Sequence, residues 1–152
     1  LRTPSKLTVG ASGFIGKFGF VTADVEYINY GSAFIKSDDL SADQADNDDI
    51  SGSYSSTFNY RVGGELRLDA FRVRGGYGFF GDFDDRDGYD SSRDQYSFGL
   101  GYRQRDFFID LAFVHRNGNQ TYAPYIIQDG YQPLVDVETK RNTVSATVGF
   151  NF

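Results

Sequence analysis

The sequence predicts an all-β fold of about seven antiparallel strands, of the transmembrane β-barrel class, and three observations predict it. Apolar residues alternate with small or polar ones in seven segments, which is the period of a strand with one apolar face. Short turns alternate along the chain with long polar stretches. Aromatic residues make up 17% of the chain, yet the sequence has no run of about 18 apolar residues that would make a transmembrane helix.

The first hairpin is predicted around the short turn Gly16-Lys17-Phe18, between strands at about 4 to 15 and 19 to 35. Two more hairpins follow the same plan. Asp69-Ala70 connects strands at about 55 to 68 and 71 to 81, and Arg105-Asp106 connects strands at about 94 to 104 and 107 to 117. The final strand ends with Thr143 to Phe152, in which apolar residues occupy the even-numbered positions.

Residues 36 to 54, 82 to 93 and 118 to 137 are rich in Asp, Ser, Asn, Gly and Pro and are predicted to be long loops. Short turns on one side and long loops on the other are typical of bacterial outer-membrane barrels, where the short turns are periplasmic. The chain is therefore expected in the outer membrane, in contact with its lipid and with lipopolysaccharide. Its carboxy terminus would be periplasmic and its long loops extracellular.

Charged residues in the interior of the predicted strands lie on one face. A Lys or Arg facing lipid at the bilayer midplane costs about 2 to 4 kcal/mol, so this face is expected to line the lumen. With Asp69-Ala70 as the turn, Glu65 falls opposite Arg74 and Arg67 opposite Arg72. The wall is predicted either to stiffen the lumen with ion pairs or to guide the carboxylate of an amphipathic substrate. Its members are Asp24, Glu26, Arg61, Glu65, Arg67, Arg72, Arg74, Arg103 and Asp110.

The opposite face carries aromatic residues near both ends of the strands, as in the interfacial girdles of membrane barrels. The predicted girdle near the short turns is Phe71, Tyr102, Phe107 and Phe152, and the one nearer the long loops is Tyr27, Phe58, Tyr60, Tyr77, Phe79, Tyr96 and Phe113. A soluble β-sandwich or lipocalin-type barrel would show the same period with its apolar face packed inward. The predicted strands, however, are longer than the usual soluble strand of about 5 to 6 residues.

The composition excludes several other functions. The net charge of −6 and the lack of Lys and Arg clusters argue against a nucleic-acid partner. No Ser-His-Asp set, metal-ligand cluster or phosphate loop is present, so neither enzymatic activity nor a cofactor is expected. The single histidine, His115, is expected on the outward face near the upper interface, away from the inward Asp110.

Two acidic stretches offer carboxylates that hard cations prefer. Residues 37 to 49 lack the spacing and the glycine of an EF-hand loop. The segment 82 to 88 is closer to that pattern, with Asp84, Asp85 and Asp87 as weak metal candidates, but Phe83 occupies the place of the first ligand. Solvated loops that face the medium, and that bridge to lipopolysaccharide through cations, are the expected alternative.

The strand count predicts a partner for the sheet. Bacterial barrels have an even number of strands, starting at eight, and seven strands leave the two ends on opposite sides. We therefore expect one barrel segment over residues 1 to 152, without a separate domain, that the remaining amino-terminal part of the barrel or a partner subunit completes. A complete eight-stranded barrel stays open if residues 118 to 137 contain another strand.

Several segments recur in a known family in the same order and spacing. They are Leu1-Arg2-Thr3-Pro4, Gly19 to Tyr30, Tyr60-Arg61-Val62-Gly63-Gly64-Glu65-Leu66-Arg67, Arg72-Val73-Arg74-Gly75-Gly76-Tyr77 and Phe108-Ile109-Asp110-Leu111-Ala112-Phe113. The chain resembles the carboxy-terminal half of the long-chain fatty-acid transporter (FadL-type) outer-membrane family. This resemblance implies half of a 14-stranded barrel that carries hydrophobic compounds such as long-chain fatty acids, with the plug upstream. The alternative is a small structural or interaction barrel, or a barrel subunit that holds partner proteins, without transport.

Overall fold

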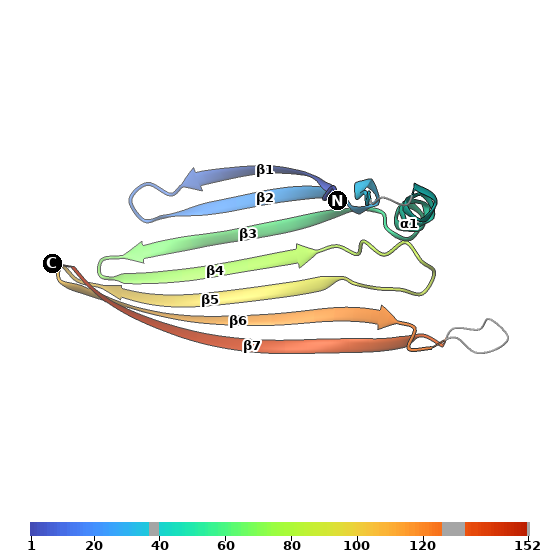
Figure 1. Cartoon of the computed structure of the whole chain (residues 1–152). Coiled ribbons are helices and arrows are strands. Elements are labelled where there is room, and N and C mark those ends of the chain that lie inside the picture. The colour runs from blue at the N-terminus through green and yellow to red at the C-terminus, as the bar shows by residue number, and fades with distance from the viewer. Residues whose placement is uncertain (37–39, 126–132, 152) are drawn as a thin grey trace.

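The computed structural model describes residues 1–36, 40–125 and 133–151, which form one seven-stranded antiparallel sheet in sequence order (Figure 1). This confirms the predicted all-β class and strand number. The strands are β1 (Ser5–Phe14), β2 (Gly19–Asn29), β3 (Ser56–Leu68), β4 (Phe71–Phe80), β5 (Arg93–Arg103), β6 (Phe107–Tyr122) and β7 (Val135–Phe150). A short 3-10 helix, η1 (Tyr30–Ser32), and an α-helix, α1 (Leu40–Ser53), separate β2 from β3. No helix in the described ranges is long and apolar enough to cross a membrane.

The three predicted short turns are confirmed, and all lie at the same end of the sheet (Figure 1). In the first, the amide of Phe18 donates to the carbonyl of Ile15 at 2.9 Å. In the second, Asp69 adopts a φ of 51°, the left-handed conformation that Asp tolerates better than most residues. These turns need only local sequence signals, which explains why the sequence predicts them correctly.

The prediction of a loop over residues 36 to 54 is wrong, because α1 occupies most of it. The predicted strand to residue 35 is also too long, since β2 ends at Asn29. The side chain of Asn47 holds the helix to the chain that precedes it. Its Nδ2 donates to the carbonyls of Ile35 at 2.8 Å and Asp43 at 2.6 Å, and its Oδ1 accepts from the amide of Ile35 at 2.8 Å.

The predicted loop over residues 118 to 137 is wrong at both ends. β6 continues to Tyr122 and β7 begins at Val135, so that Gly118 pairs with Thr139 and Tyr122 with Val135. On β6, residues Gly118 to Thr121 carry no large apolar side chain, so the sequence shows no apolar alternation there, although the backbone ladder continues. Within the described part of this stretch the extra strand residues lengthen β6 and β7, and no eighth strand forms; residues 126 to 132 lie outside the described residues.

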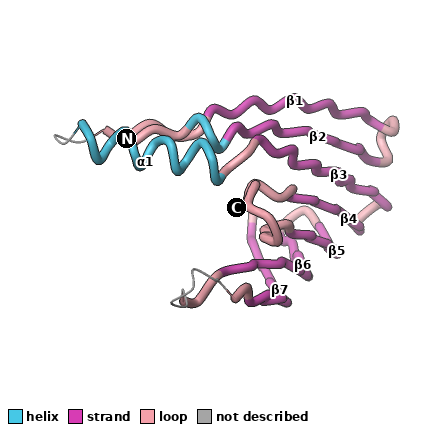
Figure 2. The backbone as a smooth tube through the Cα atoms, turned by 90° about the vertical axis from the view of Figure 1, so that its right-hand side faces the viewer, coloured by secondary structure: helices cyan, strands magenta, loops and turns pink. Residues whose placement is uncertain are grey.

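The sheet is curved but not closed (Figure 2). In the described ranges β1 pairs only with β2 and β7 only with β6, so two strand edges stay free. Because every neighbouring pair is antiparallel, the odd-numbered strands β1 and β7 run in the same direction, from the long-loop end to the short-turn end. Any closure of this sheet must therefore accommodate two parallel edges.

Burial in the sheet is the reverse of that in a soluble domain. Among the described residues Ile28 is the only large hydrophobic side chain that is buried, while Glu26 and Asn59 are each only 4% exposed. Large apolar side chains are instead exposed in every strand, for example Tyr60 at 47% and Leu111 at 51%. Side chains crowd together on the polar face, whereas no segment of the described ranges packs against the apolar face.

Candidate functional site: a polar wall and an apolar band

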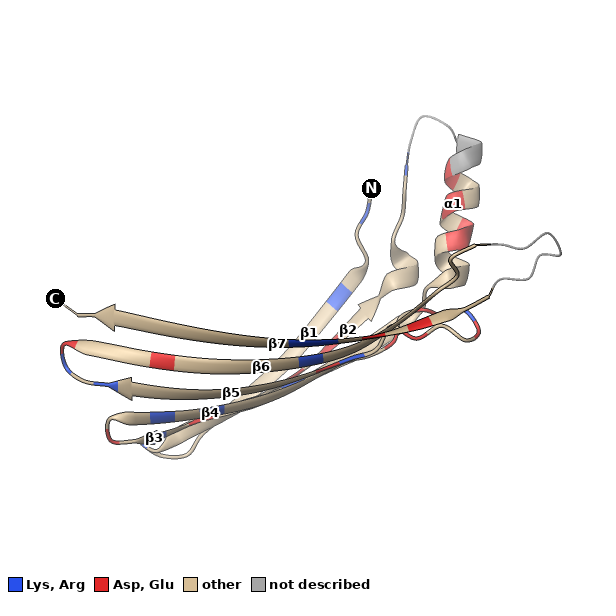
Figure 3. Ribbon diagram, turned by 90° about the horizontal axis from the view of Figure 1, so that it is seen from below, with Lys and Arg blue, Asp and Glu red and all other residues tan. Residues whose placement is uncertain are grey.

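The ladder register places the predicted wall residues on one face of the sheet. Asp24 pairs with Arg61, and Glu65 with Arg74, as predicted from the turn at Asp69-Ala70. Acidic and basic residues are interspersed along the strands, and α1 adds a separate acidic stretch (Figure 3). We call the nine predicted residues, together with Lys6 and Asn59, the polar wall.

The part of the polar wall on β1, β2 and β3 is centred on the buried carboxylate of Glu26. Glu26 forms an ion pair with Lys6, accepts a hydrogen bond from Asn59 Nδ2 at 2.9 Å and lies 3.6 Å from a guanidinium nitrogen of Arg61. The Nε of Arg61 also donates to Asp24 at 2.6 Å. A buried carboxylate is stable only when it is paired and hydrogen-bonded, and Glu26 meets both conditions.

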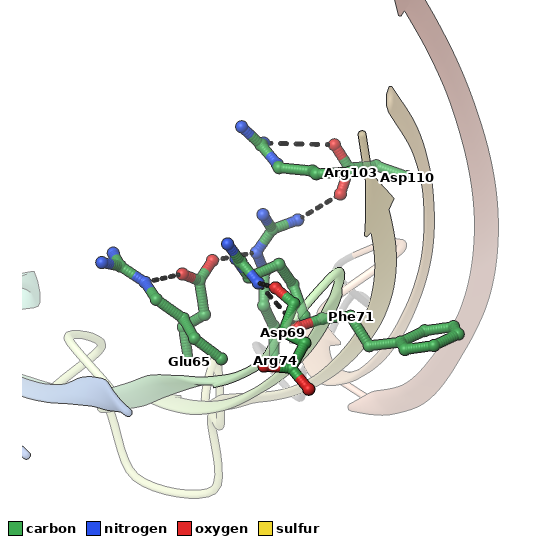
Figure 4. Close-up of polar contacts among 8 residues, drawn as sticks. Glu65, Asp69, Phe71, Arg74, Arg103 and Asp110 are labelled. Atoms are coloured by element: carbon green, nitrogen blue, oxygen red, sulfur yellow. Dashed lines mark hydrogen bonds and ion pairs between the residues drawn. The ribbon is translucent and has the colours of Figure 1, made fainter. Parts of the chain in front are cut away.

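A second network joins β3, β4, β5 and β6 (Figure 4). Glu65 accepts from Arg67 and from Arg74, both at 2.7 Å. Arg74 also binds Asp110 at 2.7 Å, and Asp110 lies 3.5 Å from Arg103. These side chains lie together on one side of the sheet, whereas Phe71 points away from them (Figure 4).

Arg72 is the wall residue that stays outside these networks. It lies directly opposite Arg67, as predicted, which is an unfavourable like-charge pair. Glu65 compensates Arg67, but the Nη1 of Arg72 donates instead to the backbone carbonyls of Asp69 at 2.7 Å and Phe71 at 2.8 Å. The backbone of the turn thus supplies the acceptors for Arg72.

The opposite face carries the apolar band, which we define as the outward apolar residues of β1 to β7. Aromatic rings follow one another near its long-loop edge, with ring centroids 5.1 Å apart for Tyr27 and Phe58, 6.5 Å for Tyr60 and Phe79, and 5.0 Å for Tyr77 and Tyr96. Near the short turns Tyr102 lies 5.2 Å from Phe71 and 6.0 Å from Phe107. Phe113 shares this face, paired with Phe98, and Phe152 lies outside the described residues.

The apolar band crosses the strands obliquely. One row of paired residues on the outward face, made of Val25, Tyr60, Phe79, Asp94, Asn117 and Lys140, is apolar on β2 to β4 and polar on β5 to β7. The short turns are displaced from strand to strand in the same sense. The amide of Arg67 on β3 donates to the carbonyl of Phe18 in the first turn, and the amide of Arg103 on β5 donates to the carbonyl of Ala70 in the second, so each later strand extends beyond the preceding turn. A shift of about one residue per strand corresponds to a strand tilt of about 35° at ordinary strand spacings.

His115 lies on the outward face at the long-loop edge of the band. Its ring centroid is 6.5 Å from that of Tyr96, and its Nδ1 lies 2.6 Å from Oδ1 of Asn142. Asp110 faces the other side of β6, so the two residues do not form a dyad. The placement agrees with the parity argument from the sequence.

The weak metal candidates do not come together. Asp84 is paired with Arg86 at 2.5 Å, and this guanidinium holds the pKa of the Asp84 carboxyl below its usual range. Asp85 and Asp87 are exposed. In the described part of the chain no group of at least three His, Cys, Asp or Glu side chains is arranged to hold a metal ion.

Sequence reasoning missed two members of the wall and a basic group above it. Lys6 and Asn59 have the inward parity, but neither is an acid or an arginine within a charged run. Arg93, Arg116 and Arg141 also face inward, on β5, β6 and β7. Applying the parity rule to the full length of the last strands would have identified Arg116 and Arg141, which lie beyond the apolar band.

Comparison with protein-family models, with curated proteins and with solved structures finds no match to this chain.

Proposed function

We propose that this sheet is part of a bacterial outer-membrane β-barrel, with the apolar band facing lipid and the polar wall facing the lumen. The reversed burial of the two faces carries this proposal. Exposed residues such as Val144, at 74%, and Phe71, at 59%, would be unfavourable in water but favourable against acyl chains. A soluble sandwich would require a second layer over this face, and no described segment covers it.

The dimensions of the apolar band support the same proposal. From Phe58 to Leu68 the outward positions of β3 extend about 33 Å along the strand at about 3.3 Å per residue. At the tilt of about 35° this length crosses about 27 Å, close to the height of about 25 Å of the apolar band of membrane barrels. Aromatic residues at the two edges of the band would lie at the level of the lipid head groups.

The orientation follows the usual asymmetry of these barrels. The short turns would face the periplasm, together with the carboxy-terminal end of β7, while α1 and the long connections would face the medium and lipopolysaccharide. The acidic residues of α1 would then lie outside the cell. Lipopolysaccharide is itself anionic, so contact with this helix would require bridging cations.

The free edges define what would complete the barrel. Since β1 and β7 run in the same direction, antiparallel closure requires an odd number of additional strands. If a second copy of the chain lay beside the first around a common axis, β7 of one copy would pair with a parallel β1 of the other, so the barrel would not close in an antiparallel manner. The remaining amino-terminal part of the barrel, or a partner subunit, would supply the odd set.

For activity, we propose transport of hydrophobic compounds such as long-chain fatty acids across the outer membrane, as the FadL-type resemblance implies. The polar wall would guide the polar end of the compound, and no catalytic step is assigned to the chain. Protein purified from outer membranes in a non-ionic detergent should bind a long-chain fatty acid in a saturable manner. Absence of saturable binding by protein with an intact barrel would contradict transport.

The two free edges favour a second candidate, a barrel subunit that holds partner proteins at the membrane without transport. Unpaired strand edges are sites where another chain adds its own strands. Co-purification of a stoichiometric large partner from outer membranes, without fatty-acid binding, would support this role. Saturable fatty-acid binding by the protein free of any partner would favour transport.

A further inference from the structure

At the long-loop end of β5, β6 and β7, beyond the ion-paired wall, the polar face carries a basic pocket. The proposed transport role does not use this pocket. Arg93, Arg116 and Arg141 line a cavity of about 440 Å³ over β5, β6 and β7, together with Gln95, Gly118 and Thr139. Arg116 lies directly opposite Arg141 in the ladder, and Gln95 lies opposite Arg116. We call Arg93, Arg116 and Arg141 the arginine pocket.

The arginine pocket has no protein counter-charge among the described residues. Arg61, Arg67, Arg74 and Arg103 of the wall each pair with a carboxylate, whereas no carboxylate of the described ranges forms an ion pair with Arg93, Arg116 or Arg141. Asp94 also lines the cavity, but its carboxylate lies on the other face of the sheet, where it accepts from the Tyr77 hydroxyl at 2.5 Å. Among the residues that the structure describes, no carboxylate therefore compensates the repulsion between the opposed Arg116 and Arg141.

The arginine side chains are held in place by contacts that leave guanidinium donors free. Nε of Arg116 donates to Oε1 of Gln95 at 2.7 Å, which orients this guanidinium. The Arg93 guanidinium lies over the ring of Phe80, 5.6 Å from its centroid. Gly118 makes room for this arrangement, because a Cβ there would lie 2.9 Å from Cγ of Arg93.

We infer that the arginine pocket binds a phosphate-type oxyanion, either free in the lumen or as the head group of an amphiphile. Guanidinium groups bind phosphate oxygens through paired N–H donors, and a phosphate can carry more than one negative charge. Several unpaired arginines on adjacent strands match such a ligand better than a single carboxylate. The inference rests on the proposed inward orientation of the polar face, but not on fatty-acid transport.

The test is calorimetric titration of the protein, purified from membranes in a non-ionic detergent, with inorganic phosphate and with dodecyl phosphate. Arg116→Gln and Arg141→Gln should each weaken binding by about tenfold or more, because each removes a charged hydrogen-bond donor. Both substitutions also remove a like-charge repulsion, so the variants should fold. Arg105→Gln, in a short turn at the other end of the sheet, is the matched control and should bind normally.

The two ligands separate the sources of the oxyanion. Binding of both, weakened by the pocket variants alone, would support a free phosphate site, and binding of dodecyl phosphate alone would support an amphiphile head group. Binding of neither ligand, or equal binding by the pocket variants and the wild type, would overturn the inference. Fatty-acid binding measured on the same samples would show whether the proposed transport role fails separately.

Discussion

Arg74 of β4 forms an ion pair with Asp110 of β6 across the strand between them, with 2.7 Å from Nη1 to Oδ1 (Figure 4). The two side chains meet because the β5 residues that lie between them on that face are Gly99, paired with Arg74, and Gly101, paired with Asp110. A Cβ on Gly101 would lie 2.4 Å from Oδ1 of Asp110. The glycines of β5 therefore make the charged network continuous from β3 to β6.

Gly101→Ala should displace the Asp110 carboxylate and break its pair with Arg74. We expect a loss of about 1 to 3 kcal/mol in the free energy of unfolding, the usual penalty for a charged group that loses its partner. Reversible urea unfolding in lipid vesicles measures it. Gly75→Ala is the control, since a Cβ at Gly75 meets no atom within 4 Å, and it should change stability by less than about 1 kcal/mol. Equal effects of the two substitutions would refute the role assigned to Gly101.

Arginine substitutions at adjacent positions of β7 should distinguish the two faces. Ala146 pairs with Leu111 on the apolar band, whereas Ser145 pairs with Ala112 on the polar face. Ala146→Arg should lower the free energy of unfolding in lipid vesicles by about 2 to 4 kcal/mol, because the guanidinium would enter the acyl region. Ser145→Arg serves as its control and should change stability far less. A larger loss for Ser145→Arg would mean that the faces are assigned the wrong way round.

The connection between β4 and β5 should lose its order only in acid. The Arg86 side chain lowers the pKa of Asp84, and hydrogen bonds from Ser92 lower that of Asp90. A carboxyl group whose pKa is lower in the folded state than in the unfolded state stabilises the fold. This stabilisation is complete above the unfolded-state pKa of about 3.9 and is lost as the pH falls through the folded-state pKa. Amide-exchange protection of Ser92, which donates to Asp90 at 2.8 Å, should hold from pH 7 to 5 and fall below about pH 4.

The exchange measurement has an internal control. The amide of Asn119 donates to the carbonyl of Ser92 at 2.9 Å, a backbone bond without a titrating acceptor. Corrected for intrinsic exchange rates, its protection should decrease less than that of Ser92 over the same range. Loss of Ser92 protection between pH 7 and 5 would show that the Asp90 carboxylate does not order this segment.

The strands and their faces were predictable because they depend on local signals. The turn at Asp69 sets the pairing of Glu65 with Arg74, and the period of two then assigns every side chain on β3 and β4 to a face. The same reasoning predicts the two aromatic girdles. The extension of β6 and β7 at the long-loop end, beyond the apolar band, was not predictable in this way. Residues there such as Asn117 and Asn119 are polar, and polar residues are expected both in a strand outside the membrane and in a loop.

The helix and the individual ion pairs depend on contacts distant in sequence. α1 has no apolar stripe to indicate a helix, and Asn47 ties it to Ile35 through backbone groups that no periodicity reveals. Similarly, parity places Arg74 and Asp110 on the same face, but not in contact. Their contact requires the small residues of β5 between them, which become relevant only once the register of three strands is known.

A lipid-accessibility scan along β6, in the protein reconstituted in bilayers, tests directly whether the apolar band faces lipid. The chain has no cysteine, so single cysteines can carry a spin label at Ile109, Leu111 and Phe113 on one face and at Phe108, Ala112 and Val114 on the other. If the apolar band faces lipid, the first set is accessible to oxygen dissolved in lipid and the second set to a water-soluble nickel chelate. Equal aqueous accessibility of both sets, or the reverse pattern, would contradict a membrane-facing apolar band.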